Sequence, residues 1–180
     1  MQNLLFILCF LLISCSTFYN INDDNIIKYN QPIKLESSFL INGRFFIKSS
    51  NSYYGNFTWM HNKLEDNIEF KSPIGQVFTK LNINNKTKLS NLIIKQKIYE
   101  SDDIENIMQQ NLGFYLPFQY LYFWVCGANV PNYPVDKYFY NGFKQFNFEV
   151  YFLSWYDINH PKVIKIMNDN TVIKLFLTWN

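Results

Sequence analysis

The chain has 180 residues, of which 48% are hydrophobic and 19% aromatic, and its formal net charge is +2. This length suits one domain with a large apolar interior. The mild charge argues against a nucleic-acid-binding protein, which usually carries a concentrated basic patch.

The N-terminal segment has the pattern of a bacterial lipoprotein signal. Its apolar run over 4–13 is shorter than the about 20 residues that a bilayer span needs, but it has the length of a signal-peptide core. Leu12-Ile13-Ser14-Cys15 ends this run with small residues and a cysteine, although residues 1–3 carry no basic side chain. The alternative is a secretory peptide or an anchor helix with an incidental cysteine.

This signal divides the chain into three parts. We expect residues 1–14 to be a signal peptide that is removed, residues 15–22 to form a tether with Cys15 lipidated, and residues 23–180 to form a single domain. Cys126 is then the only thiol left, so no internal disulfide can form. Because Cys126 ends an apolar stretch, we expect it to be a small buried hydrophobe.

Alternation with a period of two residues predicts most of the domain to be β-strands. A weak helical pattern over 23–35, ended by Pro32, comes first. The strands that follow are separated by polar turns. They are expected over 39–48, 53–59, 67–71, 76–83 and 88–95, and then over 146–152, 162–167 and 171–179.

Two helices are predicted between the two groups of strands. Asp102 and Glu105 have the spacing of a capping box, and the helix they begin would stop at Gly113. Pro117 suits the first turn of a second helix that ends at Gly127 and is apolar over most of its surface. The fold class is therefore mainly β with helices (α+β), an antiparallel sheet wrapped around its own helices.

No pattern of catalytic or metal-binding residues is present. His61 and His160 are far apart and belong to no metalloprotease or nucleophile motif, and no glycine-rich phosphate loop occurs. The acidic pairs are expected to be solvated or to cap helices; they are Asp23-Asp24, Glu65-Asp66 and Asp102-Asp103. We therefore predict no catalytic residue, no metal and no cofactor.

Several short motifs occur in an order that resembles the LolB family. Members of this family are outer-membrane receptors that accept lipoproteins from periplasmic carriers of the LolA type. The matching segments are Gly43-Arg44-Phe45, Gly55-Asn56-Phe57-Thr58-Trp59, Ser72-Pro73-Ile74-Gly75, Tyr99, Leu116-Pro117, Leu121, Trp124-Val125, Gly127, His160-Pro161-Lys162 and Ile173-Lys174-Leu175. The chain departs from the family after Gly127, where Ala128-Asn129-Val130-Pro131 is looser than the usual short spacing from glycine to proline.

The resemblance implies an incomplete antiparallel β-barrel with a helical lid or plug over a hydrophobic cavity for acyl chains. It implies three partners: a LolA-type periplasmic carrier, acylated lipoprotein cargo and outer-membrane phospholipid. It also implies a monomer that is lipid-anchored in the outer membrane and faces the periplasm. No nucleic acid is expected.

The resemblance implies roles for individual residues, and for each residue an ordinary structural role is the alternative. By position, Ile74 is the exposed apolar residue of the membrane-insertion loop; otherwise it folds back on the barrel. The candidates for the cavity wall are Phe45, Phe57, Trp59, Phe70, Leu121 and Trp124, each of which could instead be plain core. Arg44 lies at the cavity mouth or pairs with a surface carboxylate.

Two other functions remain open. A structural or assembly lipoprotein of the outer membrane would have a solid core and no ligand cavity. A lipid hydrolase is the third possible function, but the sequence contains no catalytic motif that supports it. Uptake of an apolar probe by the mature chain would separate the transfer function from the scaffold.

Overall fold

The computed structural model describes residues 35–180. The predicted signal peptide, the lipidation site Cys15, the tether 15–22 and nearly all of the expected helix over 23–35 lie outside the described residues. Those predictions therefore stay predictions. Neither helix in the described part has the length and apolar character needed to cross a bilayer.

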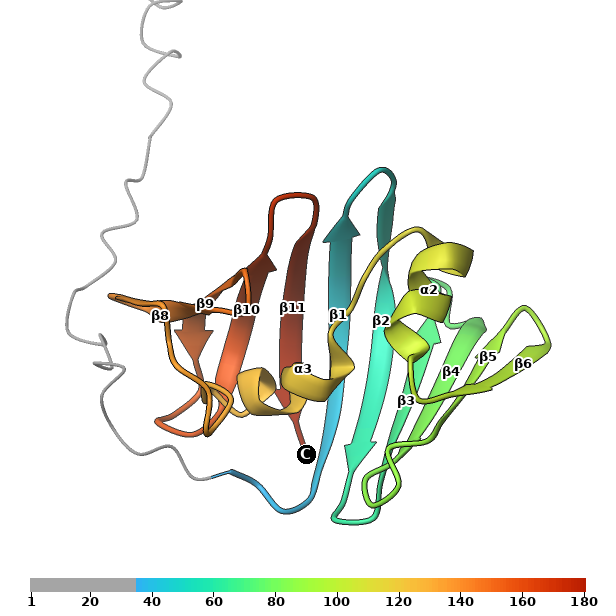
Figure 1. Cartoon of the computed structure of the whole chain (residues 1–180), viewed down its shortest axis with the longest axis horizontal. Coiled ribbons are helices and arrows are strands. Elements are labelled where there is room, and N and C mark those ends of the chain that lie inside the picture. The colour runs from blue at the N-terminus through green and yellow to red at the C-terminus, as the bar shows by residue number, and fades with distance from the viewer. Residues whose placement is uncertain (1–34) are drawn as a thin grey trace, which may run out of the picture.

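The described residues form one antiparallel sheet of eleven strands (Figure 1). Its first half contains β1 (Phe39–Lys48), β2 (Ser52–His61), β3 (Glu65–Lys71), β4 (Val77–Asn84), β5 (Ser90–Ile94) and β6 (Lys97–Ser101). Its second half contains β7 (Lys137–Phe139), β8 (Gly142–Gln145), β9 (Phe148–Trp155), β10 (Pro161–Met167) and β11 (Val172–Trp179). The spatial order is β6-β5-β4-β3-β2-β1-β11-β10-β9-β8-β7, so the first strand pairs with the last at the centre of the sheet.

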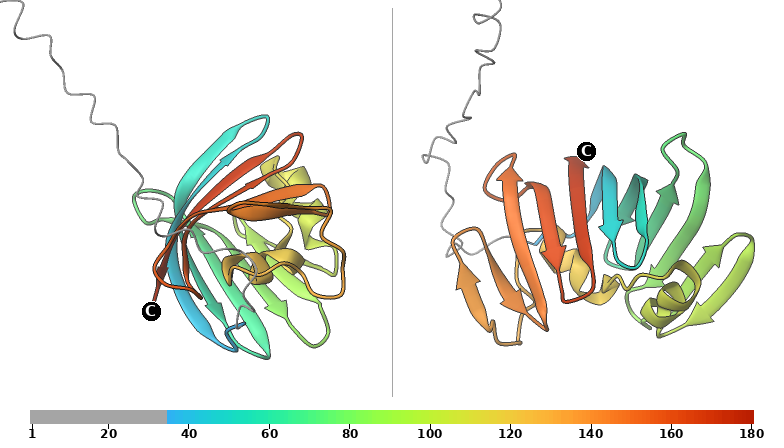
Figure 2. Two further views of the ribbon diagram at one scale, coloured as in Figure 1. Left: turned by 90° about the vertical axis from the view of Figure 1, so that its left-hand side faces the viewer. Right: turned by 90° about the horizontal axis from the view of Figure 1, so that it is seen from above.

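The sheet curls without closing, because β6 and β7 remain its two edges. Figure 2 shows the strands as an arc with both helices on its concave side. Side chains alternate along each strand between this inner face and the outer face, as in the buried and exposed positions of β1. The expected fold class, an incomplete antiparallel barrel with a helical element, is confirmed.

The two helices differ in what they cover. α2 (Ile104–Leu112) packs against β5 and β6 through Ile104, Met108 and Leu112 and ends at Gly113 with φ of +74°. α3 (Phe118–Val125) lies across the middle of the concave face (Figure 1). Gly127 follows it with φ of +82°, and a methyl group there would lie 2.6 Å from the Trp155 ring. Glycine is therefore required at this turn.

Several details differ from the sequence-based expectation. Asp103, not Asp102, caps α2, and its carboxylate accepts a hydrogen bond from the Asn106 backbone N–H. The short strands β6, β7 and β8 were not expected. Phe146, expected within a strand, instead lies in the turn before β9 with φ of +54°. Strands as short as these give too few alternations to be recognised.

Candidate functional site

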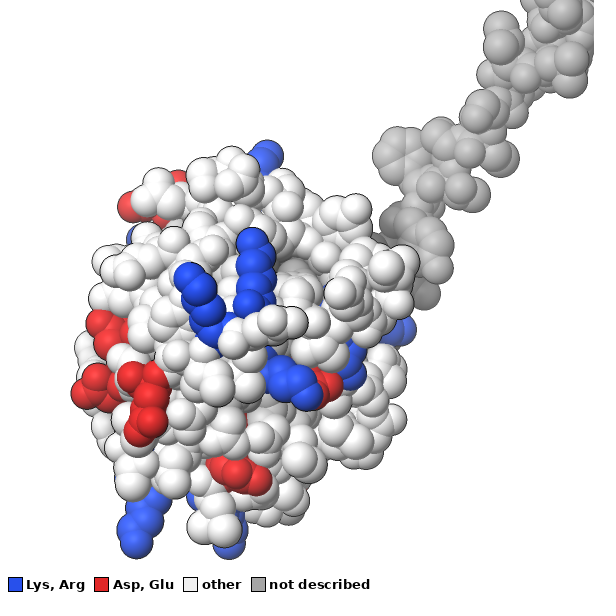
Figure 3. Space-filling view, turned by 90° about the vertical axis from the view of Figure 1, so that its right-hand side faces the viewer, with Lys and Arg blue, Asp and Glu red and all other residues white. Residues whose placement is uncertain are grey.

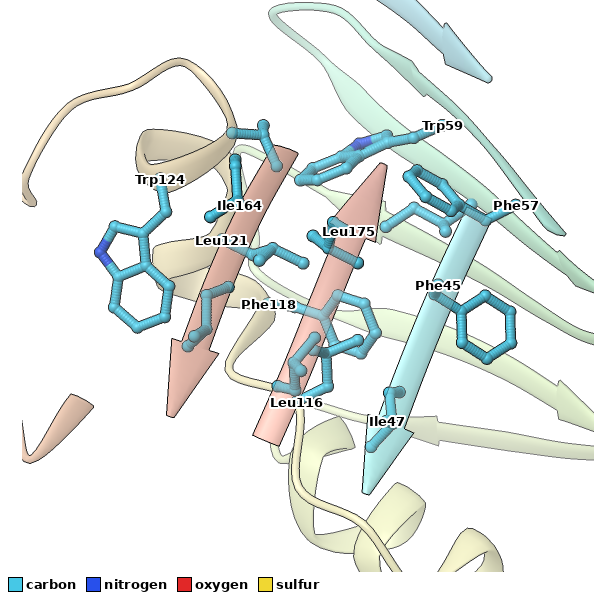
Figure 4. Close-up of a cluster of buried hydrophobic side chains, with 14 of the residues drawn as sticks. Phe45, Ile47, Phe57, Trp59, Leu116, Phe118, Leu121, Trp124, Ile164 and Leu175 are labelled. Atoms are coloured by element: carbon cyan, nitrogen blue, oxygen red, sulfur yellow. The ribbon is translucent and has the colours of Figure 1, made fainter. Parts of the chain in front are cut away.

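The concave face of the sheet and the segment 114–125 together enclose an apolar interior. A small cavity lies between them, lined by Phe57, Trp59, Ile68, Phe70, Leu116, Phe118, Leu121 and Leu175. The strand residues of this set share one face because β1, β2, β3 and β11 are paired in register. Figure 4 shows Phe118 and Leu121 directed from α3 toward β11 and β1.

The structure brings four of the six predicted cavity residues together. Phe57, Trp59, Phe70 and Leu121 line the cavity. The other two are buried but do not line the cavity.

Phe45 makes an edge contact with Phe70, their ring centroids 5.5 Å apart. Trp124 lies on the other side of α3 (Figure 4), 5.4 Å from the ring of Phe148. Its indole N–H is buried without an acceptor among the described residues. The predicted set missed four lining residues, Ile68, Leu116, Phe118 and Leu175. Leu116 lies in a loop that carries no periodic signal, and strand alternation gives an inward side chain without saying which part of the interior it lines.

The interior is almost filled in this structure. The cavity measures about 20 Å³, which is room for about one water molecule. Leu116 is 2% exposed and Phe118 is 4% exposed, so both side chains occupy the space that a ligand would need. A molecule larger than water would fit here only if the segment carrying these two residues moved.

A buried polar cluster lies at the end of β2 and β3. The Trp59 Nε1–H donates to Asp66 Oδ1 over 2.6 Å, and the Nδ1 atom of His61 lies 2.7 Å from the same oxygen. Both His61 and Asp66 are buried. The expectation that Asp66 is solvated or caps a helix is therefore wrong. Asp66 is in phase with Ile68 and Phe70 along β3, and that alternation is the signal that could have revealed its burial.

This polar cluster also fixes α3 on the sheet. The His61 ring stacks on both the Phe39 ring and the Tyr122 ring, at centroid distances of 4.9 Å and 4.4 Å. The Tyr122 hydroxyl donates to the carbonyl oxygen of Glu36 over 2.9 Å. Burial raises the pKa of Tyr122 to about 12, so the hydroxyl stays protonated and remains a donor at neutral pH.

The loop between β3 and β4 presents Ile74 to solvent. Ile74 is 90% exposed, the largest exposed fraction among the large hydrophobic side chains of the described residues. The Gly75 N–H donates to the Ser72 carbonyl and the Ser72 N–H donates to the Gln76 carbonyl, each over 2.8 Å. These bonds and the φ of +86° at Gly75 hold a tight turn whose apolar tip does not pack on the sheet.

Arg44 is found in neither of its expected places. It lies on the outer face of β1, with its guanidinium carbon 5.2 Å from the centre of the Phe176 ring. It makes no ion pair with a carboxylate of residues 35–180. Outward alternation along β1 explains this position, since Phe45 and Gly43 on either side face inward.

The remaining reactive side chains of residues 35–180 form no recognisable catalytic centre. Cys126 is 1% exposed, as expected of a buried hydrophobe, and burial raises the pKa of its thiol to about 12. His160 pairs with Asp157 at 2.7 Å on the surface, which lowers the pKa of that carboxyl. Within residues 35–180, no group of three or more His, Cys, Asp or Glu side chains is placed to hold a metal ion.

These features define an open antiparallel β-barrel with an apolar concave face, a helical plug and one exposed apolar loop. The sequence pattern of the family described as Outer membrane lipoprotein LolB matches residues 37–179. The chain belongs to the LolB family.

Individual relatives agree with this assignment. A Neisseria meningitidis protein named Outer-membrane lipoprotein LolB is 30% identical over 105 residues, which are 58% of this chain and 54% of that protein. A protein of the same name from Nitrosomonas europaea is 27% identical over 60% of this chain and 48% of its own length. Another from Chromobacterium violaceum is 24% identical over 80% of this chain and 81% of its own length. The chain thus spans about half the length of the Neisseria and Nitrosomonas relatives that it matches.

Proposed function

We propose that this protein accepts acylated lipoproteins from a LolA-type periplasmic carrier and inserts them into the outer membrane. In this proposal Cys15 anchors the protein itself, the concave face holds the acyl chains of the cargo, and Ile74 enters the membrane. Membership of the LolB family supports it. The observation that carries it is a curved apolar sheet face covered by the separate, largely apolar helix α3.

The acyl chains of the cargo need an apolar binding site for energetic reasons. Each CH₂ group moved from water to an apolar environment gains about 0.8 kcal/mol, so an acylated protein cannot cross an aqueous space unaided. Transfer from the carrier to the receptor and then to the membrane needs no nucleotide if each host binds the chains more strongly than the one before. We expect α3 and the segment 114–117 to move aside when cargo enters.

Uptake of an apolar fluorescent probe tests the cavity. The chain from Ser16 onward keeps every residue of the described core, and we expect it to bind the probe and to release it to a long-chain fatty acid. The fatty acid should compete because both ligands would occupy the space now filled by Leu116 and Phe118. Absence of both uptake and competition would contradict the proposal.

Ile74 provides a separate test of the insertion step. We expect Ile74→Glu to accept cargo normally but to deliver it poorly, because a charged tip is costly to place among acyl chains. The measurement is the amount of lipoprotein moved from a loaded carrier into vesicles. Leu64→Glu is a matched control, because Leu64 is 72% exposed in a different turn, and it should deliver cargo like the parent. Equal delivery by the Ile74 variant would exclude the loop from this step.

A scaffold lipoprotein of the outer membrane is the second candidate, and the nearly filled interior favours it. A core with a cavity of about 20 Å³ needs no ligand to be stable. The probe experiment separates the two functions, since a scaffold would bind neither the probe nor the fatty acid.

A further inference from the structure

The outer face of the sheet carries a groove that the proposed cargo site does not use. It crosses β1, β2, β10 and β11 and has a volume of about 490 Å³. Its wall includes the basic residues Arg44, Lys71 and Lys162 and the neutral polar residues Asn42, Asn56 and Thr58. This composition differs from that of the concave face, which is lined by apolar side chains.

Most of the basic side chains in this groove and beside it have no ion-pair partner among residues 35–180. The Phe176 ring has Arg44 5.2 Å and Lys174 5.1 Å from its centre. Lys174 lies directly opposite Lys165 in the β10–β11 pair. Among residues 35–180, only Lys71 of these cations has a carboxylate partner, Glu69 at 3.2 Å.

Such an arrangement is unfavourable in isolation. Like charges directly opposite each other in neighbouring strands destabilise a sheet, and neither Lys165 nor Lys174 forms an ion pair with a carboxylate of residues 35–180. A bound anion would relieve this repulsion. The surface around β4, β5 and β6 is different, because acidic and basic side chains are mixed there (Figure 3).

The groove continues to the exposed loop. A second hollow of about 390 Å³ shares Arg44, Asn56 and Phe176 with the first and is also lined by Tyr54 and Pro73. Pro73 directly precedes Ile74, so the basic groove runs from the middle of the outer face to the base of the apolar tip. A phosphate layer beside an apolar layer is the arrangement found at a membrane surface.

We propose that this outer groove binds the phosphate groups of anionic membrane lipids while Ile74 enters the adjacent acyl region. Arg44 in the wall of the groove and Lys174 beside it, next to the Phe176 ring, supply the charge, and the polar side chains of the groove supply hydrogen bonds to phosphate oxygens. The inference rests on the proposed function only for the membrane role of Ile74. It assigns the convex side of the sheet to the bilayer and leaves the concave side for cargo.

Vesicle binding tests this assignment. The chain from Ser16 onward, without its acyl anchor, is mixed with vesicles of equal parts phosphatidylethanolamine and phosphatidylglycerol, and with vesicles of phosphatidylcholine alone. We expect tighter binding to the anionic vesicles. The double variant Arg44→Gln/Lys174→Gln should bind them about tenfold more weakly or worse, because each basic residue near an anionic surface contributes measurably. The difference in binding between the parent and this double variant should shrink at high salt, because salt screens the charges.

A matched control removes the same charge elsewhere. Lys86→Gln/Lys97→Gln changes two exposed lysines of the β4–β6 region and should bind anionic vesicles nearly as the parent does. An equal loss in both double variants would reduce the effect to net charge and overturn the proposal. So would equal binding of the parent to both kinds of vesicle.

Two further arms identify the ligand. Inorganic phosphate, matched in ionic strength with chloride, should release little protein; full release by phosphate alone would make this a free-phosphate site and overturn the lipid assignment. Normal vesicle binding by Arg44→Gln/Lys174→Gln together with lost cargo acceptance from a carrier would make the groove a protein-docking surface and also overturn it. Uptake of the apolar probe should be unchanged in this variant, so failure of the groove and failure of the cargo site are distinguishable.

Discussion

Asp66 places a carboxyl group in a mainly apolar interior, where it is held by the Trp59 indole and the His61 ring. Buried polar groups are tolerated when their hydrogen bonds are made, and leaving one unpaired carries the full cost of its desolvation. Because the His61 ring stacks on Tyr122, the same carboxyl group indirectly positions α3. A single residue therefore connects the sheet to the plug.

We expect Asp66→Ala to lower the free energy of unfolding by about 2–4 kcal/mol, because it leaves two buried ring nitrogens without their shared partner. Urea denaturation measures this. Glu69→Ala is the control, since Glu69 forms partly exposed ion pairs with Lys71 and Lys80 that contribute at most about 1 kcal/mol. Equal losses of unfolding free energy in the two variants would show that the buried network stabilises the fold no more than the surface ion pairs do.

Residue burial was predictable wherever alternation was long. Phe45, Phe57, Trp59 and Phe70 are all buried, as the period of their strands indicates. Asp66 and His61 share that period, but their polarity suggested an exposed turn. Arg44 was placed incorrectly because a sequence shows no outer-face partner such as Phe176. The roles of Cys15 and Ile74 remain predictions.

The α3 helix is the element on which the proposed function depends. Its eight residues are predominantly apolar, and Phe118, Leu121, Trp124 and Val125 are buried. A helix with so little polar surface is stable only when other elements cover it. Here the concave sheet covers it, and the helix in turn fills the interior. Displacing it would expose apolar surface on both partners unless cargo replaced the lost contacts.

We expect Phe118→Ala to open the interior. Removing this ring should cost about 3–5 kcal/mol in unfolding free energy and leave an apolar space on the order of 100 Å³, comparable to engineered cavities that bind small apolar molecules. Affinity for the apolar probe should rise. Phe46→Ala, at an outer position 37% exposed, should leave probe affinity unchanged. Unaltered probe affinity in the Phe118 variant would mean that α3 does not occupy the ligand site.

At the level of elements, both helices and the long strands were predictable from periodicity and from glycine and proline signals. The edge strand β6 and the short pair β7–β8 were not, because they contain only three to five residues each. The central pairing of β1 with β11 joins the two ends of the described chain. Such a long-range contact leaves no local pattern.

The whole molecule has two faces with different chemistry. The concave face is apolar and covered by helices, whereas the convex face carries the basic groove near the loop of Ile74. This separation would let one protein hold acyl chains on one side and contact lipid head groups on the other. In the proposed function, the helical plug has to move before cargo can bind, because it fills the interior.

The most direct measurement of the central claim is cargo transfer between proteins in solution. The chain from Ser16 onward is mixed with a LolA-type carrier loaded with a lipoprotein, and the two proteins are then separated. The account predicts that the lipoprotein leaves the carrier and elutes with this protein without added nucleotide. If the cargo stays entirely on the carrier while the protein remains folded, the proposed transfer function is contradicted.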